Sequence, residues 1–233
     1  MKIVTFSSLK GGAGKTTVLM ATASMLIDKG LKVACFEADE NTPLSVWKSY
    51  GTAAGTWDDN CRILPALEAD QFASSYEWAV KDGCNIGLVD TKGGGSEITE
   101  AILTSSSLVV VPTGLSVIEV DETLETLKFV VEFYKAQGLD RPYGILLNRV
   151  PTSKLSLSEQ NSMDILADLP CFESQFPARR IYSELKAIGM LHLYHKALLE
   201  IPAKRVAANH TMVALKESQA FVDELTAAMM EEA

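Results

Sequence analysis

The chain has 233 residues, a formal net charge of −9 at pH 7 and a sequence pI near 4.9. Its length suits one domain over residues 1–233, and a hydrophobic content of 47% is enough for a sizeable core. The negative charge excludes a surface that is basic all over, so any nucleic-acid contact must use a local basic patch. The cysteines are widely spaced and form no CxxC pair, which predicts buried, reduced thiols in a cytoplasmic protein.

Short apolar segments alternate with longer helix-like stretches along the chain. The apolar segments are nearly continuous in Val, Ile and Leu, as in strands that are buried on both faces of a parallel sheet. We predict strands at residues 3–7, 32–37, 86–90, 108–112 and 143–148. We predict helices at residues 16–29, 44–50, 69–81, 97–105, 119–137 and 158–169, and one long helix over 202–233. This alternation predicts an α/β fold that is doubly wound, with a mostly parallel sheet flanked by helices.

The first chemical motif lies between the first predicted strand and the first predicted helix, and it reads KGGAGKTT over residues 10–17. Leu9 breaks the standard G-x-x-x-x-G-K-[ST] pattern at its first glycine, whereas the version K-G-G-x-G-K-T-T is intact. Glycines let backbone N–H groups turn toward phosphates, and a helix N-terminus adds a favourable dipole. We expect Lys15 to bind the β- and γ-phosphates, Thr16 to offer a hydroxyl to Mg²⁺, and Thr17 to lie near the α-phosphate. The loop backbone would come from Gly11, Gly12, Ala13 and Gly14.

This motif resembles the deviant Walker A loop of the ParA/MinD family of ATPases. In that family the first lysine of the motif reaches across a dimer interface to the partner's nucleotide. The resemblance implies a homodimer that closes over ATP and Mg²⁺, with ATP hydrolysis as its activity. Lys10 would then be a catalytic residue, together with Lys15, and would neutralise charge on the transferred phosphoryl group as an arginine finger does.

Acidic residues follow two of the predicted strands, at the sheet edge where ligands bind in such folds. The family usually carries D-x-D-P-Q after the second strand, and this chain has E-x-D-E-N. Asp39 matches the aspartate that positions the attacking water, while Glu37 replaces the aspartate that lies near Mg²⁺. Asp90 ends a Walker B strand and is expected to hold Mg²⁺ through water. The glycines at 93–95 are expected to donate N–H groups to the γ-phosphate and to move as a switch.

Two further segments match the family at the nucleotide base. The resemblance implies that Asn148 hydrogen-bonds the base and that residues 177–185 close the base pocket. That second neighbourhood also contributes to DNA binding in relatives. The net charge restricts such binding to local clusters, and we expect the DNA contact among Arg179, Arg180, Lys186, Lys204 and Arg205.

Several stretches are similar to one branch of the family, the VirC ATPases of T-DNA transfer. They are FEADENTPLSVW at residues 36–47, the DT-x-GG continuation at Asp90, and GMLHL at residues 189–193. The resemblance covers most of the chain. It implies an ATPase that binds DNA, either overdrive-like or non-specific, and gathers the relaxosome at a cell pole for type IV secretion.

Other functions share part of this pattern. A plasmid-partition ParA, which works on the nucleoid with a centromere-binding partner, has every nucleotide motif. A nucleotide-gated DNA adaptor with negligible hydrolysis stays open because Glu37 replaces an aspartate. A MinD-type membrane ATPase would end in a basic amphipathic helix, whereas this chain ends in the acidic FVDELTAAMMEEA, so we expect no membrane insertion. A metal site at His192 and His195 would need a third ligand, and the sequence places none there. A nitrogenase-reductase-like electron carrier would need a cysteine pair beside the glycines that follow Asp90, and no cysteine lies beside them.

Overall fold

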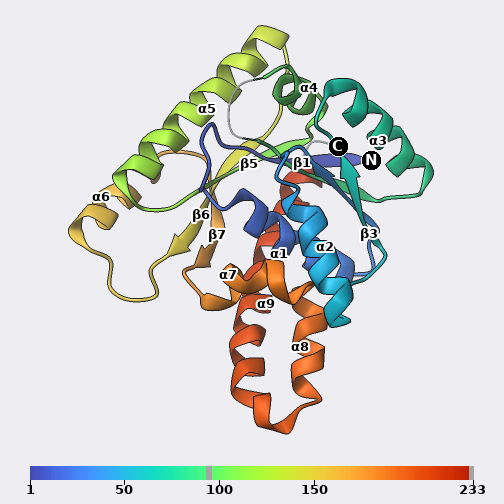
Figure 1. Ribbon diagram of the computed structural model, residues 1–233. Coiled ribbons are helices and arrows are strands. Elements are labelled where there is room, and N and C mark those ends of the chain that lie inside the picture. Colours follow the sequence, from blue (N-terminus) through green and yellow to red (C-terminus); the bar gives the residue numbers. More distant parts are fainter. Residues whose placement is uncertain (93–95, 231–233) are drawn as a thin grey trace.

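A parallel sheet forms the centre of the computed structural model, which describes residues 1–92 and 96–230 (Figure 1). Within those residues the sheet has seven strands, and every neighbouring pair is parallel. From one edge to the other they are β3 (Cys61–Pro65), β2 (Val33–Glu37), β4 (Ile86–Asp90), β1 (Lys2–Phe6), β5 (Leu108–Thr113), β6 (Tyr143–Val150) and β7 (Cys171–Pro177). The predicted doubly wound α/β fold is confirmed.

Helices cover both faces of this sheet. One face carries α1 (Lys15–Asp28), α2 (Pro43–Ala54), α7 (Arg180–Ile188), α8 (Leu191–Leu199) and α9 (Arg205–Met230), and the other carries α3 (Ala69–Lys81), α4 (Glu97–Ser105), α5 (Val117–Gln137) and α6 (Leu157–Leu166). Side chains alternate along a strand, so in β1 Val4 and Phe6 point toward α1 while Ile3 points toward α3 and α4. A helix pair, α8 and α9, extends beyond the sheet (Figure 1).

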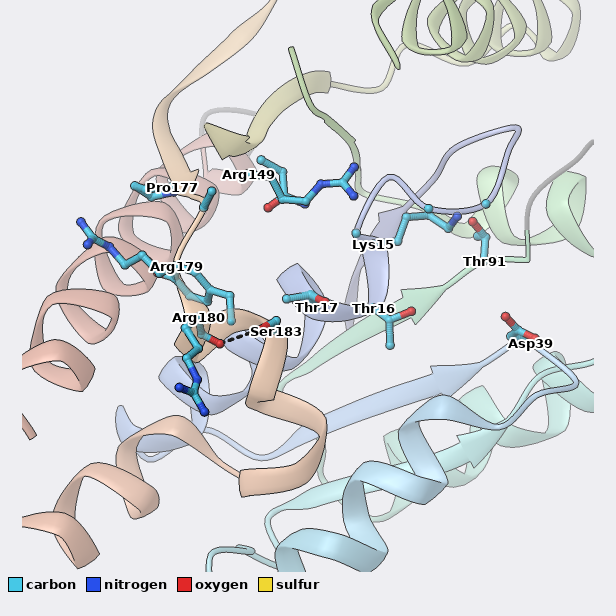
Figure 2. A pocket seen from close by; sticks show the side chains of 16 residues that line it. Lys15, Thr16, Thr17, Asp39, Thr91, Arg149, Pro177, Arg179, Arg180 and Ser183 are labelled. Carbon is cyan, nitrogen blue, oxygen red and sulfur yellow. Dashed lines mark hydrogen bonds between the residues drawn. The ribbon is translucent and has the colours of Figure 1, made fainter. Parts of the chain in front are cut away.

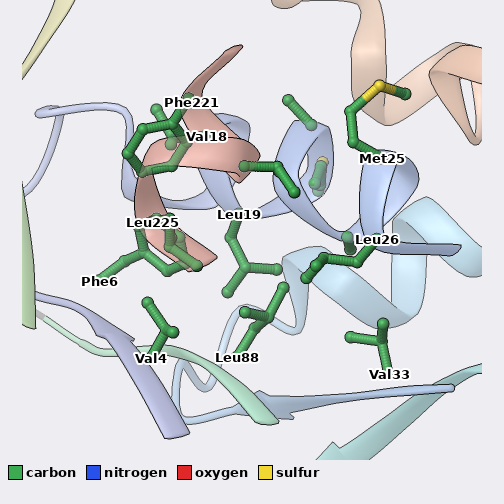
Figure 3. Close-up of a cluster of buried hydrophobic side chains, with 14 of the residues drawn as sticks. Val4, Phe6, Val18, Leu19, Met25, Leu26, Val33, Leu88, Phe221 and Leu225 are labelled. Carbon is green, nitrogen blue, oxygen red and sulfur yellow. The ribbon is translucent and has the colours of Figure 1, made fainter. Parts of the chain in front are cut away.

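The larger core lies between the sheet and α1. This helix is apolar around most of its circumference, because strands lie on one side of it and α9 on the other. Figure 3 shows side chains from α1, the strands and α9 meeting in this layer. They include Val18, Leu19, Met25 and Leu26 of α1, Val4, Phe6, Val33 and Leu88 of the strands, and Phe221 and Leu225 of α9.

The structure corrects several expectations from the sequence. Strands β3 and β7 were missed because both lie at sheet edges, where side chains are partly exposed and the apolar run is interrupted. Cys171 is exposed rather than buried, since it begins the edge strand β7, while the other three cysteines are buried. The last helix does not begin at Pro202: a 3₁₀ turn over Pro202–Lys204 precedes α9.

The topology brings the predicted motifs to one edge of the sheet. Phe6 of β1 and Glu37 of β2 are both in register with Asp90 of β4, so these three parallel strands end together. The KGGAGKTT loop leaves β1 at this edge and leads into α1. None of the described helices is long and apolar enough to cross a bilayer.

Candidate functional site

The loop between β1 and α1 has the conformation of an anion-binding turn. Gly12 and Gly14 have φ values of +98° and +86°, in the left-handed region that favours glycine. A β-carbon on Gly14 would also collide with the amide of Asn148. Gly14 is the N-cap of α1, and no side chain caps this helix end. The first backbone N–H groups of α1 are therefore available to an anion.

Lys15 is the first residue of α1, and only 8% of it is exposed. Its ammonium group donates a hydrogen bond to the Ser8 hydroxyl, 3.0 Å away. Burial lowers the pKa of Lys15, while the nearby carboxylates of Asp90 and Asp39 act in the opposite direction. Ser8 was not among the predicted site residues, although a hydroxyl residue just before the glycines was a usable signal. A buried cation with one neutral partner suits an anionic ligand.

Asp90 and Thr16 meet at the carboxyl end of β4. The Thr16 hydroxyl donates a hydrogen bond of 2.6 Å to Asp90 Oδ2, while the buried Oδ1 has no hydrogen-bond partner among residues 1–92 and 96–230. Burial raises the pKa of Asp90 from 3.8 to about 6, against the effects of Thr16 and Lys15. An oxygen without a partner beside a threonine hydroxyl is a donor set that suits hydrated Mg²⁺. These residues fit the ion that we expected here.

Glu37 has a different environment from the one we expected. Its carboxylate lies at the N-terminus of α2, where Oε1 accepts hydrogen bonds from the backbone N–H groups of Leu44 and Ser45, the second at 3.0 Å. Oε2 accepts a hydrogen bond from the Ser45 hydroxyl. Glu37 therefore caps a helix in this structure. Its role near Mg²⁺ stays a prediction, and the capping contacts compete with it.

Asp39 borders the same cleft as the glycine loop. Its Oδ1 accepts hydrogen bonds from the backbone and side-chain nitrogens of Asn41, both at 2.9 Å. The next residue, Glu40, forms an ion pair of 2.9 Å with Lys92. This ion pair joins the loops after β2 and β4. The predicted switch glycines at 93–95 lie outside the described residues.

A cleft of about 600 Å³ extends from the glycine loop to the start of α7 (Figure 2). The end at the glycine loop, where we expect the phosphates, is its phosphate end and is lined by Gly11, Gly12, Gly14, Lys15, Thr16, Thr17, Asp39 and Thr91. Asn148 and Arg149 of β6 also line the cleft, together with Pro177, Ala178, Arg179, Arg180, Tyr182 and Ser183 of the segment after β7. The predicted nucleotide residues therefore converge on one cavity, with the segment after β7 at its far end. Ala13 takes part through its carbonyl, which accepts a 2.9 Å hydrogen bond from Asn148. Base recognition by Asn148 stays a prediction, since here its amide holds the loop.

Lys10 lies outside that cleft. Its ammonium group forms an ion pair of 3.3 Å with Glu122 of α5, and 59% of the Lys10 side chain is exposed. The backbone N–H of the preceding residue, Leu9, donates a hydrogen bond to Thr126 of the same helix. The loop carrying Lys10 is therefore attached to α5, away from its own cleft.

The predicted DNA-binding residues divide into two sets. Arg179 is paired with Glu217 through hydrogen bonds of 2.6 and 2.9 Å, and Arg180 with Glu184 at 2.6 Å. Figure 2 shows both side chains near the far end of the cleft. Lys186, Lys204 and Arg205 are exposed, and none of the three forms an ion pair within residues 1–92 and 96–230. Only this second set presents free positive charge.

The two histidines of α8 are both buried. The Nδ1 atom of His192 lies 2.8 Å from the Ser24 hydroxyl, and burial lowers the pKa of His192. The ring nitrogens of His195 have no hydrogen-bond partner among the described residues. No cluster of three metal-binding side chains occurs in the described part of the chain.

The sheet order, the loop after β1 and the acidic residues at the same sheet edge give this chain the fold of P-loop NTPases of the ParA/MinD type. A structure of a putative plasmid partition protein from Borrelia burgdorferi B31, bound to AMPPNP, is similar with a TM-score of 0.68, covering 97% of this chain and 98% of that one at 16% identity. The septum site-determining protein MinD from Pyrococcus horikoshii OT3, complexed with Mg-ADP, is similar with a TM-score of 0.61, covering 93% and 95% at 20% identity. At these identities the likeness concerns the fold.

The family follows from the sequence comparisons. The family model of the VirC1 protein matches residues 1–232. Protein virC1 of Rhizobium rhizogenes is 38% identical over 217 residues, which cover 93% of this chain and 94% of the relative. The chain belongs to the VirC1 family.

Proposed function

We propose that this chain is a Mg²⁺-dependent ATPase, one domain over residues 1–233, that dimerises when ATP is bound and binds DNA. It would position a DNA-transfer complex, the relaxosome of T-DNA or conjugative transfer, at a cell pole in the cytoplasm. The observation that carries the proposal is the hydrogen bond between Thr16 and the buried Asp90 beside the buried Lys15, at a helix N-terminus without a side-chain cap among the described residues. These groups match the charges of a metal–polyphosphate ligand.

The roles of the residues follow from their positions. Lys15 and the first N–H groups of α1 would bind the phosphates, and Thr16 and Asp90 would hold the hydrated ion. Mg²⁺ neutralises charge on the β- and γ-phosphate oxygens when it is bound. Asp39 borders the phosphate end of the cleft, where a carboxylate can accept a hydrogen bond from the attacking water.

The dimer proposal is supported by the surface around the Lys10 loop. Val117 and Ile118, in the first turn of α5, are 57% and 69% exposed, and Glu122, the partner of Lys10, is one turn further along. Exposed apolar residues beside a charged loop are typical of a surface that another protein covers. A second copy of the chain bound to this face would lie within reach of Lys10.

The DNA proposal is supported by the exposed cations Lys186, Lys204 and Arg205, which form no ion pair with the described residues. Replacing Lys204 and Arg205 with glutamate should weaken binding to duplex DNA and reduce its salt dependence, by about one unit of slope for each phosphate that is no longer neutralised. Lys81→Glu is a matched control, because this exposed ammonium group faces Glu77 on α3, on the other face of the sheet and outside the cleft. Equal affinities of the double variant and wild type, in a salt-controlled gel shift, would exclude this surface.

Two measurements separate the proposal from its alternatives. Steady-state phosphate release distinguishes an ATPase from a nucleotide-gated adaptor. The helix cap made by Glu37 favours the adaptor, because a carboxylate that accepts hydrogen bonds from α2 is less available to Mg²⁺. Competition between overdrive-like and unrelated duplexes, with ATP present, distinguishes a transfer protein from a partition ATPase that binds DNA without preference. A wild-type protein that neither binds nor hydrolyses MgATP would exclude the proposed function.

A further inference from the structure

Arg149 has an unusual backbone for its residue type. It lies near the end of β6 with φ of +57°, and it is one of two non-glycine residues with positive φ in the described ranges. The left-handed conformation is unfavourable for a side chain of this size. Residues held in such conformations cluster at binding and catalytic sites. This position therefore suggests a role for the side chain of Arg149.

The guanidinium group of Arg149 is held by Glu119 of α5. The two form an ion pair between Nη2 and Oε1, and the other carboxylate oxygen accepts hydrogen bonds from the backbone and hydroxyl of Ser116. Ser116 and Glu119 together make the capping box of α5. A β-carbon on Gly114 would collide with the carboxylate of Glu119, so this glycine leaves the space that the carboxylate fills.

Arg149 also borders the nucleotide cleft. It lines the same cavity as Lys15 and the loop glycines, and about half of its side chain is exposed. In Figure 2 the guanidinium extends from the end of β6 toward the side of the cleft that holds Lys15. A nucleoside triphosphate would bring several negative charges to this cleft, whereas Glu119 offers one. Guanidinium groups bind phosphate oxygens with two parallel hydrogen bonds.

We propose that Arg149 is a polyphosphate-binding residue that Glu119 holds until a nucleotide enters the cleft. The inference rests on the proposed nucleotide binding. It adds Arg149 to the residues that bind the phosphates, and Glu119 as the group that competes with the phosphates for Arg149. Binding would transfer the guanidinium from the carboxylate to the phosphates. Glu119 then opposes nucleotide binding, although it does not itself line the cavity.

Two variants test the transfer of Arg149 from Glu119 to the phosphates, and they should change the affinity for MgATP in opposite directions. Arg149→Gly removes the guanidinium and suits the left-handed backbone, so strain does not confound the result. Glu119→Gln removes the competing charge, and its amide oxygen can still complete the capping box. Calorimetric titrations with MgATP, MgADP and AMP measure both variants against wild type. Arg149→Asn, which also tolerates positive φ, serves if the glycine variant does not fold.

We expect Arg149→Gly to bind MgATP about tenfold more weakly and Glu119→Gln to bind it about two- to threefold more tightly, which are typical magnitudes for one charge-assisted contact and one exposed ion pair. The loss should be smaller with MgADP and absent with AMP. Unchanged affinity of Arg149→Gly, weaker binding by Glu119→Gln, or an equal loss with AMP would each overturn the inference. If wild type itself fails to bind MgATP, the proposed function fails instead.

Discussion

The ammonium group of Lys10 lies 3.3 Å from the carboxylate of Glu122 in the same chain. Glu119, one turn earlier on α5, holds Arg149. The start of α5 therefore provides counter-ions for two cations beside the nucleotide cleft. If Lys10 reaches a partner's nucleotide, it must first leave Glu122, and nucleotide-dependent dimerisation would then compete with an ion pair inside the monomer.

Glu122→Gln should favour the dimer. Lys10 is 59% exposed and Glu122 22%, so the loss of this solvent-accessible pair is expected to strengthen ATP-dependent self-association only by about twofold to fivefold. Lys10→Ala should keep its affinity for ATP, because Lys15 and the loop amides remain, but should dimerise weakly and hydrolyse slowly. Sedimentation equilibrium with a non-hydrolysable ATP analogue measures the first effect and phosphate release the second. Full turnover by Lys10→Ala would show that this lysine is an ordinary loop residue.

Lys15→Ala should abolish most nucleotide binding. The change removes the buried cation of the cleft and the hydrogen bond that it donates to Ser8, whose hydroxyl still donates to the carbonyl of Lys10. The expected loss is roughly tenfold to a hundredfold in affinity for MgATP, since charge-assisted contacts to phosphate are strong. Calorimetry measures it, with Lys29→Ala as a control on the same side of the molecule but outside the cleft. Wild-type affinity in Lys15→Ala would remove the phosphate-binding role of the loop.

Asp39→Ala should separate binding from hydrolysis. Asp39 borders the phosphate end of the cleft, and its carboxylate accepts hydrogen bonds only from Asn41 among the described residues. The variant is expected to bind ATP as wild type does, to hydrolyse it at least about tenfold more slowly and to accumulate the ATP-bound dimer, because loss of a general base typically costs this much or more. Light scattering and phosphate release test it together. Unchanged release would place the water-positioning role elsewhere.

The protonation of Asp90 should make stability depend on pH in the absence of Mg²⁺ and nucleotide. Its pKa is about 6 in the folded chain against an ordinary 3.8, so its protonated form is favoured by folding. The stabilisation of the folded chain that depends on protonated Asp90 is fully present below pH 3.8 and is lost as pH rises through 6. The free energy of unfolding changes by about 3 kcal/mol over this range. Relative to Asp90→Asn, the free energy of unfolding of wild type should therefore fall between about pH 4 and 7. Urea unfolding in EDTA measures it, and parallel pH profiles of the two proteins would contradict it.

Glu37→Ala should destabilise the chain even without a metal. The carboxylate makes three hydrogen bonds at the N-terminus of α2 and is 5% exposed, so its removal is expected to cost about 2 kcal/mol. Ser45→Ala, which removes only the hydroxyl contact, should cost less. Chemical denaturation with and without Mg²⁺ separates the two roles of Glu37. A loss of stability that occurs only with Mg²⁺ and nucleotide present would favour the metal role.

The sequence alone determined features that depend on residues close together in the chain. The KGGAGKTT loop, the helix after it and the Walker B aspartate could be predicted, because backbone conformation and apolar periodicity are encoded by neighbouring residues. The buried central strands could be predicted for the same reason, whereas β3 and β7 could not, because a sheet edge exposes one side and interrupts the apolar run.

The tertiary structure alone decided which partners the charged residues have. Glu37 could be placed near the site by its strand, but its contact with the start of α2 depends on where that helix packs. Three ion pairs join residues that are far apart in the chain: Lys10–Glu122, Arg149–Glu119 and Arg179–Glu217. Only the folded structure shows that these cations already have an acidic partner. Long side chains at the surface reach several positions, and only the packing of the elements that carry them determines which opposite charge lies within range.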